Sequence, residues 1–263
     1  MADILQMMGR ADFAYAQARI QARHGTRLTE RDWRRLEAMH NVAQYLHALR
    51  AAGRARWTER ITPDMSSHAV EARLRAEWRC YAEEIARFQP EPWHAAVAWT
   101  AFLADLPVLD HLLRGGVVHR WMAEDEIYAP WAHRDARERA QALAASPVAA
   151  LLREASAGTP MLRAWLNVWR RLWPRTSAAQ SDPLESVVRA VIAHGAVLRN
   201  PRVASSVGPR MALAQRMSIL FRRHVETAAA SIAHLFLEAL DLERLRAGLV
   251  RRVLLEPQRA DAA

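Results

Sequence analysis

The sequence predicts an all-α protein, because three features of its residue pattern are typical of helices. Ala, Leu, Arg and Glu dominate the chain, and all four favour helix formation. β-branched residues are sparse, and no segment shows the alternation of apolar and polar residues expected of a half-buried strand. Gly, Pro and Asp recur at helix-length intervals, where they end one helix and begin the next.

In the first half of the chain, these signals delimit predicted helices at residues 11–24, 42–52 and 67–88, with a short helix before residue 42 and another after Pro90. Thr29 and Asp32 have the spacing of a capping box and begin the short helix. Gly53 is the expected stop of the helix at 42–52. The helix at 67–88 is amphipathic, since apolar residues recur with a 3.6-residue period: Val70, Leu74, Trp78, Tyr81 and Ile85.

In the second half, predicted helices cover residues 134–144, 147–156, 160–173, 182–200 and 209–240, followed by a last helix after Asp241. Asp182 and Pro183 have the form of an N-cap followed by proline at the first helical position. The helix at 209–240 is the longest, with an apolar seam along its whole length. Residues 28–53 and 135–158 share an order of acidic, apolar and closing Ala-Gly residues, which suggests an internal repeat.

The chain is strongly basic, with a net charge of +9, and all 37 of its basic residues are arginine. This excess attracts anionic partners such as acidic proteins, lipid headgroups or nucleic acid. Cys80 is the only cysteine, so an intrachain disulfide or a cysteine zinc site is excluded, and we expect a small buried thiol. Residues 95–118 are the best membrane-span candidate, but Asp105 and Pro107 interrupt them, so we expect a soluble or peripheral protein without a secretory signal.

No motif for catalysis, cofactor binding or metal binding is found. A Gly-rich phosphate loop, G-x-S-x-G and H-E-x-x-H are all absent from the sequence. His40 and His47 can share a helix face, but two imidazoles do not hold a metal in a closed site. The acidic residues 124–126 fit a solvated turn or helix start better than an acid–base pair. A second alternative function is an enzyme whose catalytic histidines and carboxylates are distant in the sequence and are brought together by folding.

Trp165, Trp169 and Trp173 lie four residues apart and line one side of a predicted helix. One interpretation is an interfacial helix with its aromatic rings at headgroup depth. The alternative, which we favour, is a core stripe whose edges are covered by arginine stems. Under that interpretation, only Trp173, at the helix end, is open to a membrane or partner contact.

A basic, all-α protein that associates with nucleic acid or with other proteins is the alternative function that the charge suggests. A helical DNA reader concentrates its basic residues on one recognition element. Here arginines occur in nearly every helix, usually beside glutamate or aspartate, as in "TERDWRRLE" and "EARLRAEWR". This mixed pattern favours solvated helix faces, and we expect no nucleic-acid partner.

Two stretches resemble the C-subunit family of the V-type/A-type rotary ATPases, whose eukaryotic members are called d-subunits. Residues 13–49 resemble the family's opening, on Tyr15, Ala18, Arg19, Ile20, Leu28, Asp32, Trp33 and Leu36. Residues 219–253 resemble its closing pattern of a long helix with an acid near its middle, here Glu226, followed by a leucine-x-acidic helix at residues 242–246. Residues 98–115 are similar to the segment that leads into the next module.

The resemblance implies a funnel-shaped, elongated protein of about three related helical modules without an active site. The modules would cover residues 1–118 together with the closing C-terminal helices, residues 119–208, and the long helix pair at 209–263. Such a protein sits on the cytoplasmic side of the inner membrane and links central-stalk subunits to the proteolipids of the rotor ring, for proton or sodium transport. The residues expected to contact these partners are Arg19, Arg23, Trp173, Arg246, Arg251 and Arg252.

Overall fold

The computed structural model describes residues 2–200, 202 and 205–255, with the backbone alone for residues 2–10. The all-α prediction is confirmed, because the described part of the chain contains helices and no strand. The α-helices are α1 (Ala2–Gly25), α2 (Glu30–Glu37), α3 (Val42–Leu49), α4 (Ala55–Thr58), α5 (Ser67–Phe88), α6 (His94–Ala98), α7 (Leu106–Leu113), α8 (Arg120–Glu124), α9 (Ala136–Ala144), α10 (Ala149–Ser156), α11 (Met161–Arg171), α12 (Ala178–Leu198), α13 (Val207–Arg223) and α14 (Ala228–Leu255).

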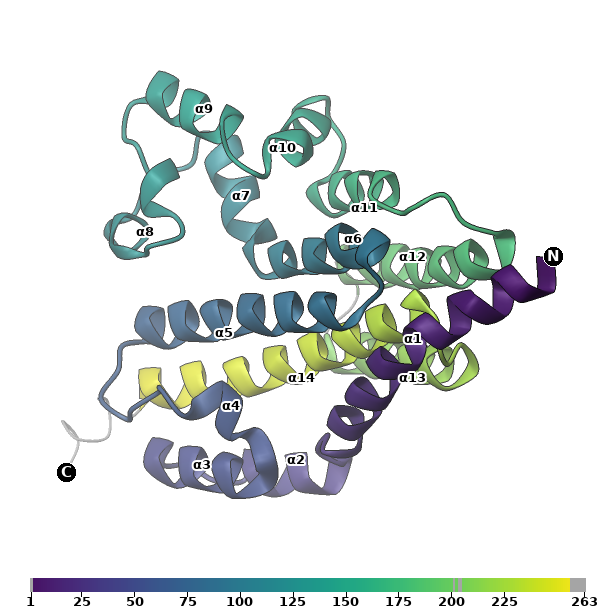
Figure 1. Ribbon diagram of the computed structural model, residues 1–263. Coiled ribbons are helices and arrows are strands. Elements are labelled where there is room, and N and C mark those ends of the chain that lie inside the picture. The colour runs from purple at the N-terminus through teal and green to yellow at the C-terminus, as the bar shows by residue number, and fades with distance from the viewer. Residues whose placement is uncertain (1, 201, 203–204, 256–263) are drawn as a thin grey trace.

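The centre of the molecule is formed by α5 and α14, which lie side by side in Figure 1. In that view α2 and α3 lie below them, and α9 and α10 lie above. The first part of α14, from Ala228 to Glu238, is buried on all sides. A helix enclosed in this way belongs to the core of the protein. Because α1 and α13 also pack on α14, the C-terminal helix holds the two ends of the chain together.

Several local predictions are confirmed in detail. The hydroxyl of Thr29 accepts a hydrogen bond from the backbone N–H of Asp32, whose carboxylate accepts one from the N–H of Thr29, so the capping box is complete. The helix predicted at 67–88 is α5, with Ser66 as its N-cap. After α3, the chain passes through a π-helical turn, Arg50–Arg54, and Gly53 ends the helical path with a φ of 80°. Only glycine adopts that conformation without strain.

Three predicted helix boundaries are wrong. Helix α1 begins at Ala2, well before the predicted start at residue 11. The Asp182–Pro183 pair does not begin a helix, because α12 begins earlier, at Ala178, and contains Pro183 within its second turn. Because proline has no N–H to donate, the backbone hydrogen bond to the carbonyl one turn earlier is missing at this position. The predicted long helix at 209–240 is broken between α13 and α14, where Glu226 has a φ of 58°. Asp241 consequently lies inside α14 and caps nothing.

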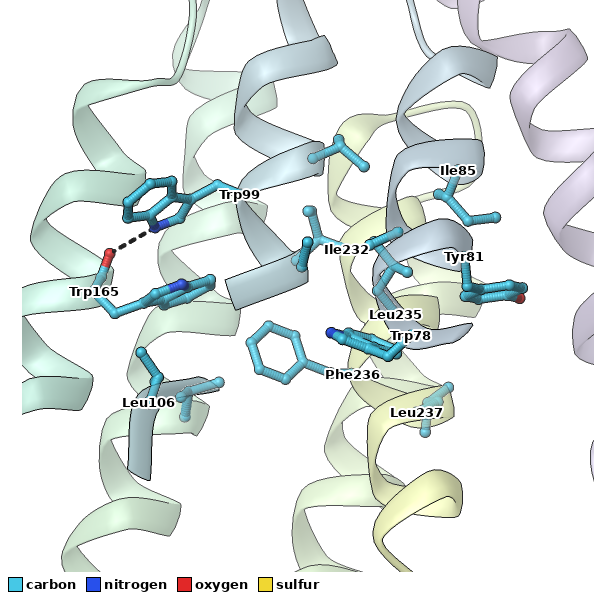
Figure 2. Close-up of a cluster of buried hydrophobic side chains, with 14 of the residues drawn as sticks. Trp78, Tyr81, Ile85, Trp99, Leu106, Trp165, Ile232, Leu235, Phe236 and Leu237 are labelled. Carbon is cyan, nitrogen blue, oxygen red and sulfur yellow. Dashed lines mark hydrogen bonds between the residues drawn. The ribbon is translucent and has the colours of Figure 1, made fainter. Parts of the chain in front are cut away.

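The tryptophan stripe belongs to the core, as we favoured. Trp165 and Trp169 on α11 are completely buried, and Trp169 Nε1 donates a hydrogen bond to the carbonyl of Ala96 at 2.9 Å. Figure 2 shows the indole of Trp99 directed at the carbonyl of Trp165, with an Nε1–O distance of 3.3 Å. The same close-up shows Phe236 of α14 between Trp165 and Trp78. The aromatic residues therefore join α5, α11 and α14 into one core.

The prediction of a buried Cys80 is wrong, because its side chain is exposed on α5. Its neighbours in the sequence explain the error: Trp78 and Tyr81 occupy the buried face, and Cys80 falls between them on the outer side. The repeat pairing of residues 28–53 with 135–158 and the division into three modules stay predictions. Both repeat segments fold as short helices, α2 with α3 and α9 with α10.

Candidate functional site

A buried ionic network joins the two ends of the chain at α14. Glu238 and Asp241 lie one turn apart on this helix and face arginines from the N-terminal region. Arg54 donates to Glu238 Oε2 at 3.0 Å and to Asp241 Oδ2 at 3.2 Å. Arg27 binds Asp241 with both Nε and Nη2, each at 2.9 Å. Such bidentate pairs fix geometry as well as charge, so the network determines how the N-terminal helices sit on α14.

The local sequence explains how these arginines reach α14. Gly53 reverses the chain after α3 and places the side chain of Arg54 inside the protein, where it is 5% exposed. Helix α1 ends at Gly25, and Arg27 extends from the following turn. Glu238 is 3% exposed, and this burial raises the pKa of its carboxyl while the Arg54 guanidinium opposes the rise.

Two arginines of α14 itself, Arg244 and Arg252, bind the α2 region. Arg244 forms hydrogen bonds with both carboxylate oxygens of Glu30, at 2.7 and 3.0 Å, and of Glu37, at 2.5 and 2.9 Å. Its hydrogen bonds lower the pKa of Glu30. Arg252 is buried and donates to backbone carbonyls, among them those of Leu36 and Glu37. Its guanidinium carbon lies 3.9 Å from the ring centre of Tyr45, a cation–π contact.

A second polar cluster lies deeper in the core, beside the ionic network. The hydroxyl of Tyr81 on α5 is 2.7 Å from Nε2 of His234 on α14. Burial lowers the pKa of His234 to about 3 and raises that of Tyr81 above its usual value. Nδ1 of His234 has no hydrogen-bond partner in the described part of the chain. Because both residues are buried, their hydrogen bond holds α5 against α14.

The residues predicted to contact partners come from α1, from α14 and from the segment after α11. Arg23 forms an ion pair with Glu84 and is half-buried, and Arg19 is exposed over the ring of Phe88. Arg246 is exposed and pairs with Glu71 at 2.5 Å.

Arg251 and Arg252 line a groove between α2, α13 and α14, but only Arg251 is exposed. The assignment of Arg252 as a contact residue therefore needs correction, because its donors are used within the chain. Trp173 is half-buried at the end of α11 and packs edge-on against Trp169.

The acidic cluster and the histidines do not form a metal site. Within the described residues, no group of three or more His, Cys, Asp and Glu side chains lies close enough to hold a metal ion. Asp125 is buried and paired with Arg75, whereas Glu124 and Glu126 are exposed at the end of α8. His40 and His47 are both exposed. The structural role of Asp125 was missed at the sequence level, since its partner is 50 residues away.

The residues of the ionic network were also missed, although one signal pointed to them. His234 and Glu238 are the two ionisable residues of the apolar run "AAASIAHLFLEAL". A charge on an otherwise buried helix requires a partner, because an unpaired buried carboxylate is costly. A buried cation near Glu238 is therefore predictable from the sequence, but its identity as Arg54 among 37 arginines is not.

Among the residues that the structure describes, one continuous stretch, Glu91–Leu113, is long and apolar enough to span a membrane, and 44% of its most apolar window is buried inside the structure. A core helix passes the same test, and here Asp105 within the stretch pairs with Arg79 at 2.5 Å and accepts a hydrogen bond from Tyr128 at 2.7 Å. Comparison of the chain with protein-family models, with curated proteins and with solved structures gave no match.

Proposed function

We propose that the chain is a non-catalytic adaptor, the central-stalk socket of a bacterial V/A-type rotary ATPase. In this role it links stalk subunits to the proteolipids of the membrane rotor ring and transmits torque for proton or sodium transport. Its place is on the cytoplasmic side of the inner membrane, as a peripheral protein. The proposal rests on the resemblance of residues 13–49 and 219–253 to the two ends of that family's sequence.

The observation that supports it best is the contact between these two stretches. They lie at opposite ends of the sequence, yet Arg27 binds Asp241, and Arg244 binds Glu30 and Glu37 across separations of more than 200 residues. Each of these side chains belongs to one of the two resembling stretches. A torque-transmitting part must resist shear, and multiple bidentate ion pairs between distant segments favour that stiffness.

One detail departs from the resemblance. The acid expected in the middle of a long helix corresponds to Glu226, which lies in the turn between α13 and α14. Its backbone N–H donates to the side chain of Gln17 on α1 at 3.0 Å. Glu226 thus joins the same end-to-end contact by its main chain, and the α13–α14 pair replaces the single long helix.

Co-purification tests this function directly. An affinity-tagged chain should be recovered with rotor-ring proteolipid from detergent-solubilised membranes of its native host. Arg19→Glu and Arg246→Glu reverse exposed charges at predicted contact positions and should reduce the recovered proteolipid severalfold. Arg163→Glu reverses an exposed charge on α11 that was not predicted to contact a partner, and should leave recovery unchanged.

Two outcomes would contradict the proposal. In the first, the chain stays soluble and alone while the intact ring is recovered from the same membranes. In the second, the chain shifts duplex DNA in a gel, with an affinity that falls steeply with salt concentration as phosphate neutralisation requires. The genes adjacent to the coding sequence give an independent check, because rotor-ring and catalytic subunits of the same ATPase should be encoded beside it.

A further inference from the structure

The groove between α2, α13 and α14 has a volume of about 550 Å³ and combines apolar residues with arginines. Trp33 and Ala214 are among its apolar residues. Val207 and Met211 lie one turn apart on α13 and also line the groove, with exposed fractions of 60% and 57%. Large apolar side chains exposed beside a concavity are typical of a surface that binds another molecule.

The charged residues of the groove leave one positive charge without an ion pair. Its three acids are Glu30, Glu37 and Asp241, and each is already paired with an arginine of the chain. Arg251 is exposed, and the described residues give it no ion pair.

The neighbouring Arg252 adds a second positive charge, since its hydrogen bonds go to neutral carbonyls and not to carboxylates. Burial lowers the pKa of the Arg252 guanidinium, and the Arg251 charge acts in the same direction. The groove therefore presents one exposed positive charge, that of Arg251, for which the described residues provide no ion pair.

We propose that this groove is a docking site for an acidic amphipathic helix of a partner protein. The apolar face of such a helix covers Val207 and Met211, and a carboxylate on its flank pairs with Arg251. The concave shape favours a helix over a bilayer, because a flat membrane surface does not enter a groove. Helix docking does not require the rotary-ATPase assignment, so the two can fail separately.

Fluorescence anisotropy with a designed peptide tests the site on the full chain. The probe is a labelled helix of Leu, Ala and Glu of about 18 residues, long enough to fold in isolation. Its controls carry Gln or Lys in place of Glu. The acidic helix should bind at least about tenfold more tightly than the Gln helix, with an affinity that falls as salt rises.

Point variants place the binding in the groove. Arg251→Glu should weaken the acidic helix at least about tenfold and create binding of the Lys helix. Met211→Ser should weaken both the acidic and the Gln helix. The matched controls are Arg163→Glu and Ile219→Ser, because Ile219 is also an exposed apolar residue of α13 but does not line the groove. Circular dichroism of each variant verifies that it is folded.

Three results would overturn helix docking. The first is equal binding of the acidic and Gln helices. The second is binding of the acidic helix that Arg251→Glu and Met211→Ser leave unchanged. The third is occupation by something else: binding to anionic phosphatidylglycerol vesicles that is lost in Arg251→Glu, or self-association that is lost in Met211→Ser. If the peptide does not bind the groove, the co-purification of the chain with the rotor ring is unaffected. If co-purification fails, the binding of the peptide is unaffected.

Discussion

Arg54 and Glu238 are 184 residues apart in the sequence, yet Nη1 of the first lies 3.0 Å from Oε2 of the second inside the protein. Their side chains are 5% and 3% exposed, so both charges are removed from water. Such a pair contributes little net stability, but neither charge is tolerated there without the other. The pair therefore specifies the packing of the turn after α3 against α14.

Removing one partner should be much more damaging than removing both. Arg54→Met leaves Glu238 buried with Arg27 as its nearest cation, at 3.9 Å, and should lower the free energy of unfolding by about 3–5 kcal/mol. The double variant Arg54→Met with Glu238→Leu should recover most of that loss. Urea denaturation followed by circular dichroism measures both.

The more exposed pairs of α14 provide the comparison. Arg244→Met breaks ion pairs with Glu30 and Glu37, whose side chains are 50% and 43% exposed, and should cost about 1 kcal/mol or less. Equal losses for Arg54→Met and Arg244→Met, or no recovery in the double variant, would show that Arg54 contributes by packing and not by charge compensation.

Stability should fall in acid because His234 is held neutral in the folded protein. Burial lowers its pKa from 6.5 to about 3, and the charges of His24, Arg27, Arg23 and Arg54 act in the same direction. The unfolded chain binds a proton near pH 6.5 and the folded chain does not. The contribution of His234 is thus complete above about pH 6.5 and declines by up to about 1.4 kcal/mol per pH unit as the pH falls toward 3.

His234→Gln isolates this contribution. The variant loses the titrating group, so its free energy of unfolding should depend less steeply on pH between about 6 and 4 than that of the unaltered chain. Burial also lowers the pKa values of His24, His194 and His224, and their contributions remain in both proteins. Parallel pH profiles for the two proteins would mean that His234 does not bind a proton on unfolding in this range.

The tryptophan stripe should show graded sensitivity to truncation. Trp169 is completely buried and its indole donates to the carbonyl of Ala96, so Trp169→Ala should cost about 3–5 kcal/mol. Trp173 is half-buried, and Trp173→Ala should cost about 1–2 kcal/mol. Thermal or urea unfolding compares the two. A larger loss for Trp173 would place the important packing at the end of α11 and not in its middle.

Residue pattern was sufficient to predict the helical class, the capping box at Thr29 and the full span of α5, since each depends on neighbours within a few positions. It failed where tertiary contacts prevailed over local signals. The apolar seam continues on both sides of Glu226, so no local signal marks the break between α13 and α14. The hydrogen bond from the backbone N–H of Glu226 to Gln17 holds the turn at this break. The Asp182–Pro183 signal also failed, because α12 begins earlier, at Ala178.

The candidate site was predictable only in part, for a related reason. Arg251 is exposed, whereas the burial of Arg252 depends on carbonyls supplied by the end of α2 and the turn that follows it. A sequence read in isolation does not show which of two adjacent arginines meets another segment. The groove itself arises from the packing of α2, α13 and α14, which come from opposite ends of the chain.

Close packing between α14 and α3 requires glycine at position 248. The substitution Gly248→Ala, which adds one methyl group, tests this requirement. A Cβ at this position would lie 2.3 Å from Oη and 2.8 Å from Cζ of the fully buried Tyr45. Gly248→Ala should therefore lower the free energy of unfolding by about 1–3 kcal/mol, despite the better helix propensity of alanine. Tyr45→Phe removes the Oη contact and, combined with Gly248→Ala, should restore part of the loss.

Gly208 near the start of α13 is the matched control for this substitution. A Cβ there meets nothing within 4 Å, and the backbone is helical, so Gly208→Ala should be neutral or stabilise the protein by up to about 1 kcal/mol. Urea midpoints of the four proteins provide the comparison. If Gly248→Ala is as well tolerated as Gly208→Ala, then Tyr45 does not pack against α14 as closely as the structure indicates, and the cation–π contact of Tyr45 with Arg252 is called into question with it.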